Sequence, residues 1–246
     1  MRLVGIGVGP GDPELLTLAG LRELTGASRI FVPVMSEEEQ GHAEVIIRHH
    51  LPGDAPVRRL VFALNHDVRG PQRHRRQRWD EAAAEVVAHL REHGGTAAFA
   101  TIGDPMIYST FTYLAATVRE LLPEVEVATV PGITAMQAAA SAAGLHLVEG
   151  TESLTVVPVT REVTGLRAAL RGGGTVVAYK GGRRLDELRA EIEAAGALDR
   201  SVYTEHLGTP RARVLPLSEV EPGADGAPYL STVVILPPRR GRGEQL

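Results

Sequence analysis

The sequence predicts an α/β protein of two α/β domains, the first on a mainly parallel sheet and the second on a mixed sheet. Strand-like apolar runs alternate with helix-like segments up to residue 144, which is typical of βαβ units. The pattern changes over residues 144–150. Further on, three strand-like segments follow one another without a helix, which favours an antiparallel portion. The expected domains are therefore 1–147 and 148–238.

Short apolar runs predict the strands of the first domain, at 2–8, 28–34, 57–62, 95–103 and 125–130. The helix-like segments that alternate with them are 13–24, 42–51, 79–94, 106–122 and 134–144. Leu15, Leu18 and Leu21 recur at helical spacing in the first of these, with Pro13 at its start. Gly94 ends an amphipathic helix, which follows a polar, arginine-rich stretch at 65–78.

In the second domain the same patterns predict strands at 153–159, 174–181, 201–207, 212–217 and 228–236. Helices are expected around 164–171 and 184–195. The end of the chain, 239–246, has only one apolar residue, its last, and we expect it to be a disordered tail.

Composition excludes several kinds of chemistry. The chain of 246 residues has no cysteine, which excludes disulfides, zinc–thiolate sites, iron–sulfur clusters and thiol nucleophiles. Its net charge of −4 argues against nonspecific nucleic-acid binding. Because no apolar run approaches the ~18 residues of a membrane span and the start lacks the pattern of a signal peptide, we expect a cytoplasmic protein. We expect no metal site, no nucleic-acid partner and no membrane partner.

The opening stretch VGIGVGPGDP (4–13) contains four glycines, two within the predicted strand 2–8 and two directly after it. A dinucleotide fingerprint needs G-x-G-x-x-G, but counting from Gly5 or Gly7 puts Pro10 or Asp12 at the sixth position. A phosphate-binding P-loop motif is also missing. The carboxylate of Asp12 would compete with an anion for the backbone N–H groups. A phosphate site is therefore disfavoured, which leaves a tight turn or the wall of another kind of site.

Two further turns follow strands in the same way. TIGDPMIYSTF (101–111) repeats the Gly-Asp-Pro sequence, and VPGITA (130–135) opens a helix lined with alanines. Ligands of open α/β sheets bind outside the carboxyl ends of the strands, where these turns are expected. Asp104 either caps its helix or faces a ribose hydroxyl or a cationic group. The small residues permit close packing against a neighbour or a ligand.

Taken together, these stretches resemble the tetrapyrrole (uroporphyrin-III/precorrin) methylase family, the class III S-adenosylmethionine (SAM) methyltransferases. The resemblance covers nearly the whole chain. The segments 79–105, 101–114 and 149–159 are most similar to the subgroup that methylates precorrin-2 at C20. Ile102 stands where the C1/C7, C4 and C11 enzymes of the family more usually have glycine. One departure from the subgroup is that 60–67 lacks a Pro-Met-Thr type stretch, which concerns contacts to the tetrapyrrole.

The resemblance implies that the active site lies in the cleft between the two domains, where SAM binds and is converted to S-adenosylhomocysteine. It also implies a homodimer. By motif position, the residues expected to contact the cofactor are Pro10, Gly103, Asp104, Ile107, Thr134, Ala135, Tyr179, Lys180 and Leu207. The implied reaction converts precorrin-2 to precorrin-3A in cobalamin biosynthesis.

Methyl transfer needs alignment of donor and acceptor, and at most one base to take a proton. Five residues stay open as that base: His66, Asp67, Tyr108, Glu152 and His206. Precorrin-2 is rich in carboxylates, which arginine binds well, so we hypothesise that Arg75 and Arg76 hold them. The alternative for this stretch is a solvated loop.

Other functions are open on the sequence alone. They are C20 methylation of cobalt-factor II in the anaerobic pathway, the reaction of another tetrapyrrole methylase, and methylation of a diphthamide precursor or ribosomal RNA. A noncatalytic protein that binds a tetrapyrrole or a nucleotide is a further alternative, which predicts eroded cofactor loops.

Overall fold

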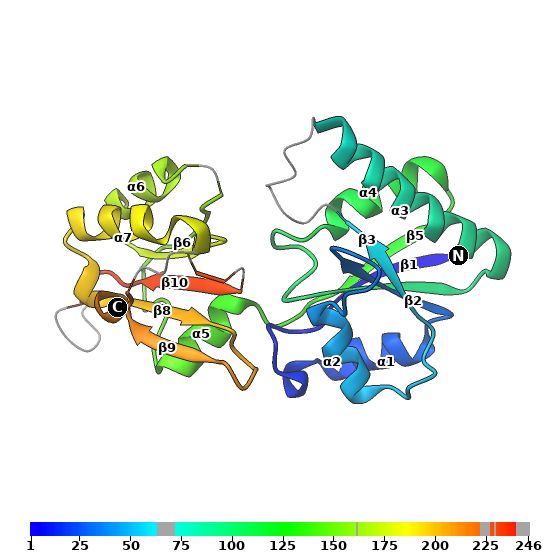
Figure 1. Cartoon of the computed structure of the whole chain (residues 1–246), viewed down its shortest axis with the longest axis horizontal. Helices are drawn as coiled ribbons and strands as arrows, with labels where there is room; N and C mark the ends of the chain where they lie inside the picture. The colour runs from blue at the N-terminus through cyan, green and yellow to red at the C-terminus, as the bar shows by residue number, and fades with distance from the viewer. Residues whose placement is uncertain (63–71, 161, 222–226, 229, 240–246) are drawn as a thin grey trace. The chain divides into compact units, whose positions relative to one another are not determined.

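The computed structural model describes residues 1–62, 72–160, 162–221, 227–228 and 230–239, except for the side chains of 72–75 and 183. The chain divides into two compact units, Met1–Thr134 and Ala135–Leu246. Figure 1 shows that each unit has a sheet with helices on both faces. The predicted class of two α/β domains, one on a parallel sheet and one on a mixed sheet, is confirmed.

The sheet of the first unit contains five parallel strands in the order β3-β2-β4-β1-β5. Their bounds are β1 (Arg2–Gly7), β2 (Arg29–Val34), β3 (Val57–Val61), β4 (Thr96–Thr101) and β5 (Glu126–Val130). The connection from β1 runs toward β2 and that from β4 runs the opposite way, toward β5. Such a reversal between neighbouring strands is where ligands bind in open α/β sheets.

Helices cover both faces of this sheet (Figure 1). They are α1 (Leu18–Gly26) and α2 (His42–His50) on one face, and α3 (Gln72–His93) and α4 (Phe111–Leu121) on the other. Side chains alternate along each strand, so Val4 and Ile6 pack toward α1 and α2, whereas Leu3 and Phe99 pack toward α3 and α4. The central strands are buried on both faces, and they therefore read as continuous apolar runs.

Three predicted helices begin or end differently in the structure. The segment 13–24 forms a 3₁₀ turn, η1 (Pro13–Leu15), and then α1, because the Thr17 hydroxyl accepts the N–H of Gly20 (3.0 Å) and caps a new helix. Helix α3 begins at Gln72, seven residues before the predicted start at 79, since glutamine and arginine are good helix formers. Helix α4 begins at Phe111 and not at 106, because residues 102–110 form a loop.

The second unit has the strand order β6-β7-β10-β8-β9, with β6 and β7 parallel and the other neighbours antiparallel. The strands are β6 (Leu154–Pro158), β7 (Thr175–Tyr179), β8 (Ser201–Glu205), β9 (Arg213–Pro216) and β10 (Ser231–Ile235). Helices α6 (Thr164–Arg171) and α7 (Leu185–Ala194) lie on one face and α5 (Ala135–Ala143) on the other (Figure 1). Further 3₁₀ turns are η2 (Gly182–Arg184), η3 (Leu198–Arg200) and η4 (Leu217–Glu219).

Helix α5 belongs to the second unit, so the division between the units falls after Thr134, earlier than the expected boundary after 147. Ala139 packs in one cluster with Val177 and Val234 of the second sheet. The Tyr179 hydroxyl accepts the backbone N–H of Met136 (2.8 Å). The small residues of α5 therefore allow close packing on this sheet. Packing against a neighbour was one of the two roles that the sequence left open for them, the other being contact with a ligand.

Arg239, expected in the disordered tail, is held in place by ordered contacts. Its Nε and Nη2 donate to the two carboxylate oxygens of Glu152 (2.9 and 2.6 Å), and its Nη1 donates to the carbonyl of His146 (3.0 Å). The Glu152 side chain is 4% exposed. The rest of the expected tail, 240–246, lies outside the described residues.

Glu152→Gln tests this ion pair. The guanidinium of Arg239 holds the pKa of the Glu152 carboxyl below its ordinary 4.5, chiefly through their hydrogen bonds. A lowered folded-state pKa stabilises the fold at neutral pH, and this contribution is lost as pH falls below about 4.5. We expect the variant to lose about 1.5–3 kcal/mol of unfolding free energy at pH 7. Urea melts at several pH values measure this; a difference that did not shrink toward pH 3 would contradict it.

Among the helices that the structure describes, none combines the length and the apolar composition that a membrane crossing requires.

Candidate functional site

Three loops leave the carboxyl ends of the adjacent strands β4, β1 and β5. They are the first loop (8–12, after β1), the second loop (102–110, after β4) and the third loop (131–134, after β5). The first two loops continue the pairing of their strands. The Val8 N–H donates to the Thr101 carbonyl (2.9 Å), and the Gly103 N–H donates to the Gly9 carbonyl (2.8 Å). These hydrogen bonds hold the first and second loops side by side.

Asp104 joins the second loop to the third. Its Oδ1 accepts the N–H of Met106 (2.8 Å), and its Oδ2 accepts the N–H of Gly132 (3.0 Å). The carboxylate therefore does not cap α4, which begins at Phe111. Each carboxylate oxygen can accept a further hydrogen bond. Asp104 can thus brace the loops and still offer acceptor capacity to a ligand.

The second and third loops and the end of β1 touch backbone to backbone at Gly132. A Cβ atom added there would lie 2.1 Å from the Gly103 carbonyl oxygen and 2.7 Å from the Gly7 Cα. Real Cβ atoms do not approach other atoms so closely, so only glycine permits this packing. The second glycine of the opening stretch thus has a packing role that its spacing did not reveal.

Gly103 offers open space on the side where a side chain would lie. The residue is buried and has a φ of +68°, a left-handed conformation that favours glycine. No heavy atom beyond its chain neighbours lies within 4 Å of the position of a Cβ. A ligand can therefore approach this stretch of backbone closely.

Asp12 stabilises the start of η1, where its Oδ1 accepts the N–H of Glu14 (2.9 Å). Its charge therefore lies at an N–H group that an anion would use, which again disfavours a phosphate here. Pro10 is buried in the same loop. Thr134 is buried at the end of the first unit, and Ala135 begins α5 of the second.

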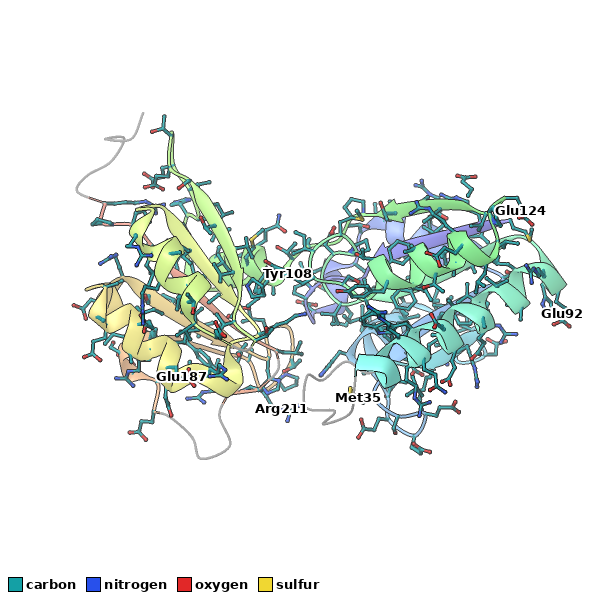
Figure 2. All side chains as sticks on the ribbon, turned by 90° about the horizontal axis from the view of Figure 1, so that it is seen from above. Met35, Glu92, Tyr108, Glu124, Glu187 and Arg211 are labelled. Atoms are coloured by element: carbon teal, nitrogen blue, oxygen red, sulfur yellow. The ribbon has the colours of Figure 1, made fainter. Side chains whose placement is uncertain are left out.

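Tyr108 is one of three non-glycine residues with positive φ in the part of the chain that the structure describes, at 51°. Its loop exposes Met106 (67%), Ile107 and Tyr108. Figure 2 places Tyr108 at the end of the first unit opposite Glu92 and Glu124. Partial burial raises the pKa of the Tyr108 hydroxyl, so it remains protonated and can donate a hydrogen bond.

The other two positive-φ residues, Lys180 (61°) and His206 (50°), directly follow β7 and β8. Both strands run antiparallel to β10 and therefore in the same direction, so their carboxyl ends lie at the same end of the second sheet. Strained backbone of this kind concentrates at functional sites. Burial lowers the pKa of the Lys180 amine. Leu207 packs against the hydrophobic cluster that contains Tyr179.

His206 is held through its backbone. Its N–H donates to the Leu230 carbonyl (3.0 Å), and its own carbonyl accepts the Thr209 hydroxyl (2.8 Å). Its ring Nδ1 is buried and has no hydrogen-bond partner within the described ranges.

The remaining residues that the sequence proposes as a base or as substrate contacts are only partly described by the structure. Glu152 is paired with Arg239 at the opposite end of the second sheet, just before β6, and its lowered pKa makes it a weak proton acceptor. His66 and Asp67 lie outside the described residues, as does the side chain of Arg75. Arg76 is exposed on α3, so the polar stretch is a helix here and not the loop that the sequence suggested. In the described ranges, no cluster of His, Asp or Glu could hold a metal ion.

Sequence reasoning overlooked one feature near the second loop. Trp79 of α3 and Tyr113 of α4 stack with ring centroids 4.2 Å apart and an angle of 6° between the planes. The only signal in the sequence is that Trp79 is the single tryptophan, because the pairing brings together residues far apart in the chain.

These observations define an α/β protein with small-residue loops at the carboxyl ends of adjacent parallel strands, without the sequence motifs of phosphate binding. A family model described as "Tetrapyrrole (Corrin/Porphyrin) Methylases" matches residues 2–221. The chain belongs to this family of SAM-dependent methyltransferases, which confirms the resemblance seen in the sequence.

Among its curated relatives is a precorrin-2 C(20)-methyltransferase of Sinorhizobium sp. It is 33% identical over 237 residues, which are 95% of this chain and 94% of the relative. A probable cobalt-precorrin-2 C(20)-methyltransferase of Methanocaldococcus jannaschii is 35% identical over 162 residues, 66% of each chain.

A solved structure has the same fold. It is the uroporphyrin-III C-methyl transferase of Thermus thermophilus complexed with S-adenyl homocysteine. The TM-score is 0.63 at 24% identity, over 96% of this chain and 92% of that one.

Proposed function

We propose that this enzyme transfers a methyl group from SAM to C20 of precorrin-2, forming precorrin-3A in cobalamin biosynthesis. The observation that carries the proposal is the junction at Gly132 of the second and third loops with the end of β1, braced by the Asp104 carboxylate. The family membership and the similarity to a precorrin-2 C(20)-methyltransferase support the reaction and the acceptor. An eroded, noncatalytic relative would not be expected to keep this junction intact.

The residues of the first unit fit a cofactor such as SAM. The open side of Gly103 permits contact with a flat base or ribose, and Asp104 has acceptor capacity left for hydroxyl groups. Ile107 and Pro10 add apolar surface, and Thr134 adds a hydroxyl. The proposal extends to Ala135, Tyr179, Lys180 and Leu207 of the second unit, as the family resemblance implies. SAM supplies a methyl group on a positively charged sulfur.

The chain has two tasks in this reaction. Its loops hold donor and acceptor in line, and such alignment can lower a barrier by about 7–11 kcal/mol. A carbon–carbon bond forms at C20 as the sulfur–carbon bond breaks, and C20 then gives up its proton. Two of the described candidate bases are poor proton acceptors, because the charge of Glu152 is neutralised by Arg239 and the Tyr108 hydroxyl is protonated. His206 stays the candidate in the second unit, with its Nε2 as the accepting atom.

Ligand-induced stabilisation and product analysis test the proposal. SAM or S-adenosylhomocysteine at 100 times its Kd should stabilise the fold by about 2.7 kcal/mol, seen as a higher unfolding midpoint. Labelled SAM is then incubated with precorrin-2, sirohydrochlorin and cobalt-sirohydrochlorin in parallel, and NMR assigns the methyl position. We expect methylation at C20. No shift at millimolar ligand, or methylation at another carbon, would overturn the proposal.

A cobalt-bearing acceptor is the second candidate, favoured by the similarity to the Methanocaldococcus jannaschii protein named for cobalt-precorrin-2. The parallel assay separates the two by relative kcat/KM. We also propose a homodimer, as the family resemblance implies; light scattering on the purified chain would give a mass near 53 kDa (2 × 26.3 kDa) for a dimer. The cytoplasmic location stays a prediction.

A further inference from the structure

The stacked pair of Trp79 and Tyr113 lies on the same side of the first unit as the second loop. Tyr113 is in the first turn of α4, which begins directly after that loop. Trp79 lies in the first third of α3, and its ring covers one face of the Tyr113 ring. Tyr113 is nevertheless 49% exposed, so the rest of its ring is open to solvent.

Trp79 is partly buried and packs against the core cluster of the first unit, but this packing leaves its polar atom unexplained. The indole Nε1 of Trp79 is buried and has no hydrogen-bond partner in the part of the chain that the structure describes. Burying an unpaired N–H is unfavourable, and phenylalanine would give a similar stack without it. Exposed aromatic surface of this kind is typical of sites that bind another molecule.

An exposed arginine lies one turn from Trp79 on α3. Arg76 precedes it by three positions on α3, and residues so spaced are neighbours on one helix face. Arg76 is exposed and has no hydrogen bond or ion pair within the described ranges. Arg78, by contrast, pairs with Glu81 (3.4 Å) and projects from a different face.

We propose that Tyr113, backed by Trp79, and Arg76 form an acceptor platform that binds the tetrapyrrole substrate. This inference rests on the proposed function. The exposed ring of Tyr113 stacks on the flat macrocycle, and Arg76 binds one of its peripheral carboxylates. The second loop, with its exposed residues Met106 and Tyr108, ends directly before α4, and Tyr113 is the third residue of that helix. The proposal therefore seats the macrocycle at the start of α4, where the second loop ends.

The test compares matched variants of the full-length chain. Tyr113→Ala removes the ring and Tyr113→Phe keeps it; Leu121→Ala is the control, an exposed apolar residue at the far end of the same helix (43%). Arg76→Gln is matched with Arg78→Gln, which removes the same charge from another face of α3. The Kd for sirohydrochlorin comes from absorption titration, the KM for precorrin-2 from initial rates, and the SAM Kd from calorimetry.

We expect Tyr113→Ala and Arg76→Gln each to raise the sirohydrochlorin Kd and the precorrin-2 KM by about tenfold. Tyr113→Phe, Leu121→Ala and Arg78→Gln should change them by less than about twofold. The SAM Kd should stay the same in every variant. Equal effects for Arg76→Gln and Arg78→Gln would overturn the charge contact, and an unchanged sirohydrochlorin Kd in Tyr113→Ala would overturn the stacking.

Failure of the proposed function gives a different result. If the wild-type chain binds sirohydrochlorin but transfers no methyl group, the function is wrong, and the titrations still decide the platform. If wild type methylates C20 and both variants do so with wild-type KM, the platform is wrong and the function stands. If Tyr113→Ala lowers the unfolding midpoint, Tyr113→Leu keeps apolar volume without an aromatic ring and is expected to give the same rise in Kd.

Discussion

Gly132→Ala is expected to abolish SAM binding and to lower the midpoint of thermal unfolding by roughly 5–10 °C. The added Cβ would lie 2.1 Å from the Gly103 carbonyl oxygen, and its other close neighbours are backbone atoms of Gly7. Backbone cannot turn away as a flexible side chain can, so the loops must move apart. Overpacking of this kind costs about 1–3 kcal/mol, and about 1 kcal/mol lowers the midpoint of a chain of this size by roughly 2–4 °C.

Gly26→Ala is the matched control, because nothing lies within 4 Å of an added Cβ and the residue ends α1 with an ordinary backbone conformation. Its midpoint and its SAM affinity should equal those of wild type or rise slightly. Calorimetry measures both quantities for the two variants. Wild-type SAM affinity in Gly132→Ala would show that the cofactor does not depend on this junction.

Asp104→Ala is expected to weaken SAM binding at least about tenfold and to cost roughly 2–3 kcal/mol of stability, because it removes charge-assisted acceptors from two backbone N–H groups. Asp104→Asn should fall between this variant and wild type. Its amide keeps one acceptor oxygen, while its NH₂ group faces the other backbone donor. Isothermal titration with SAM and chemical denaturation give the two quantities.

The control for Asp104→Asn is Asp80→Asn, which makes the same change of carboxylate to amide at an exposed position on α3. We expect its SAM Kd and its stability to match those of wild type. The prediction would be contradicted if Asp104→Ala lost stability while its SAM Kd remained unchanged, since Asp104 would then act as a brace only.

Most of the fold could be predicted from local patterns. Central strands such as β1 and β4 are buried on both faces, so they appear as uninterrupted apolar runs, and each has its expected place within a residue or two. Segment ends were less accurate. The sequence between Gly103 and Phe111 is compatible with a helix, and the loop forms because the hydrogen bonds of Asp104 and the positive φ of Tyr108 hold it.

The sequence predicts where the loops of the candidate site lie along the chain, but not which residues of different loops contact one another. Gly-Asp-Pro and Pro-Gly sequences mark turns wherever they occur. That Asp104 reaches the N–H of Gly132, 28 positions further along the chain, depends on β1 lying between β4 and β5. The ion pair of Glu152 likewise could not be predicted, because its partner Arg239 lies 87 positions away in a segment that the sequence predicts to be a disordered tail.

By itself the sequence determined the alternation of strands and helices, the absence of thiol chemistry, the exclusion of a phosphate loop and the family resemblance. These properties depend on residue type and spacing along a short stretch of chain. The tertiary structure decided that α5 packs on the second sheet, that Gly7, Gly103 and Gly132 meet, and that Trp79 stacks on Tyr113. Those contacts join residues far apart in the chain, and only the packing of the sheets and helices brings them within reach of one another.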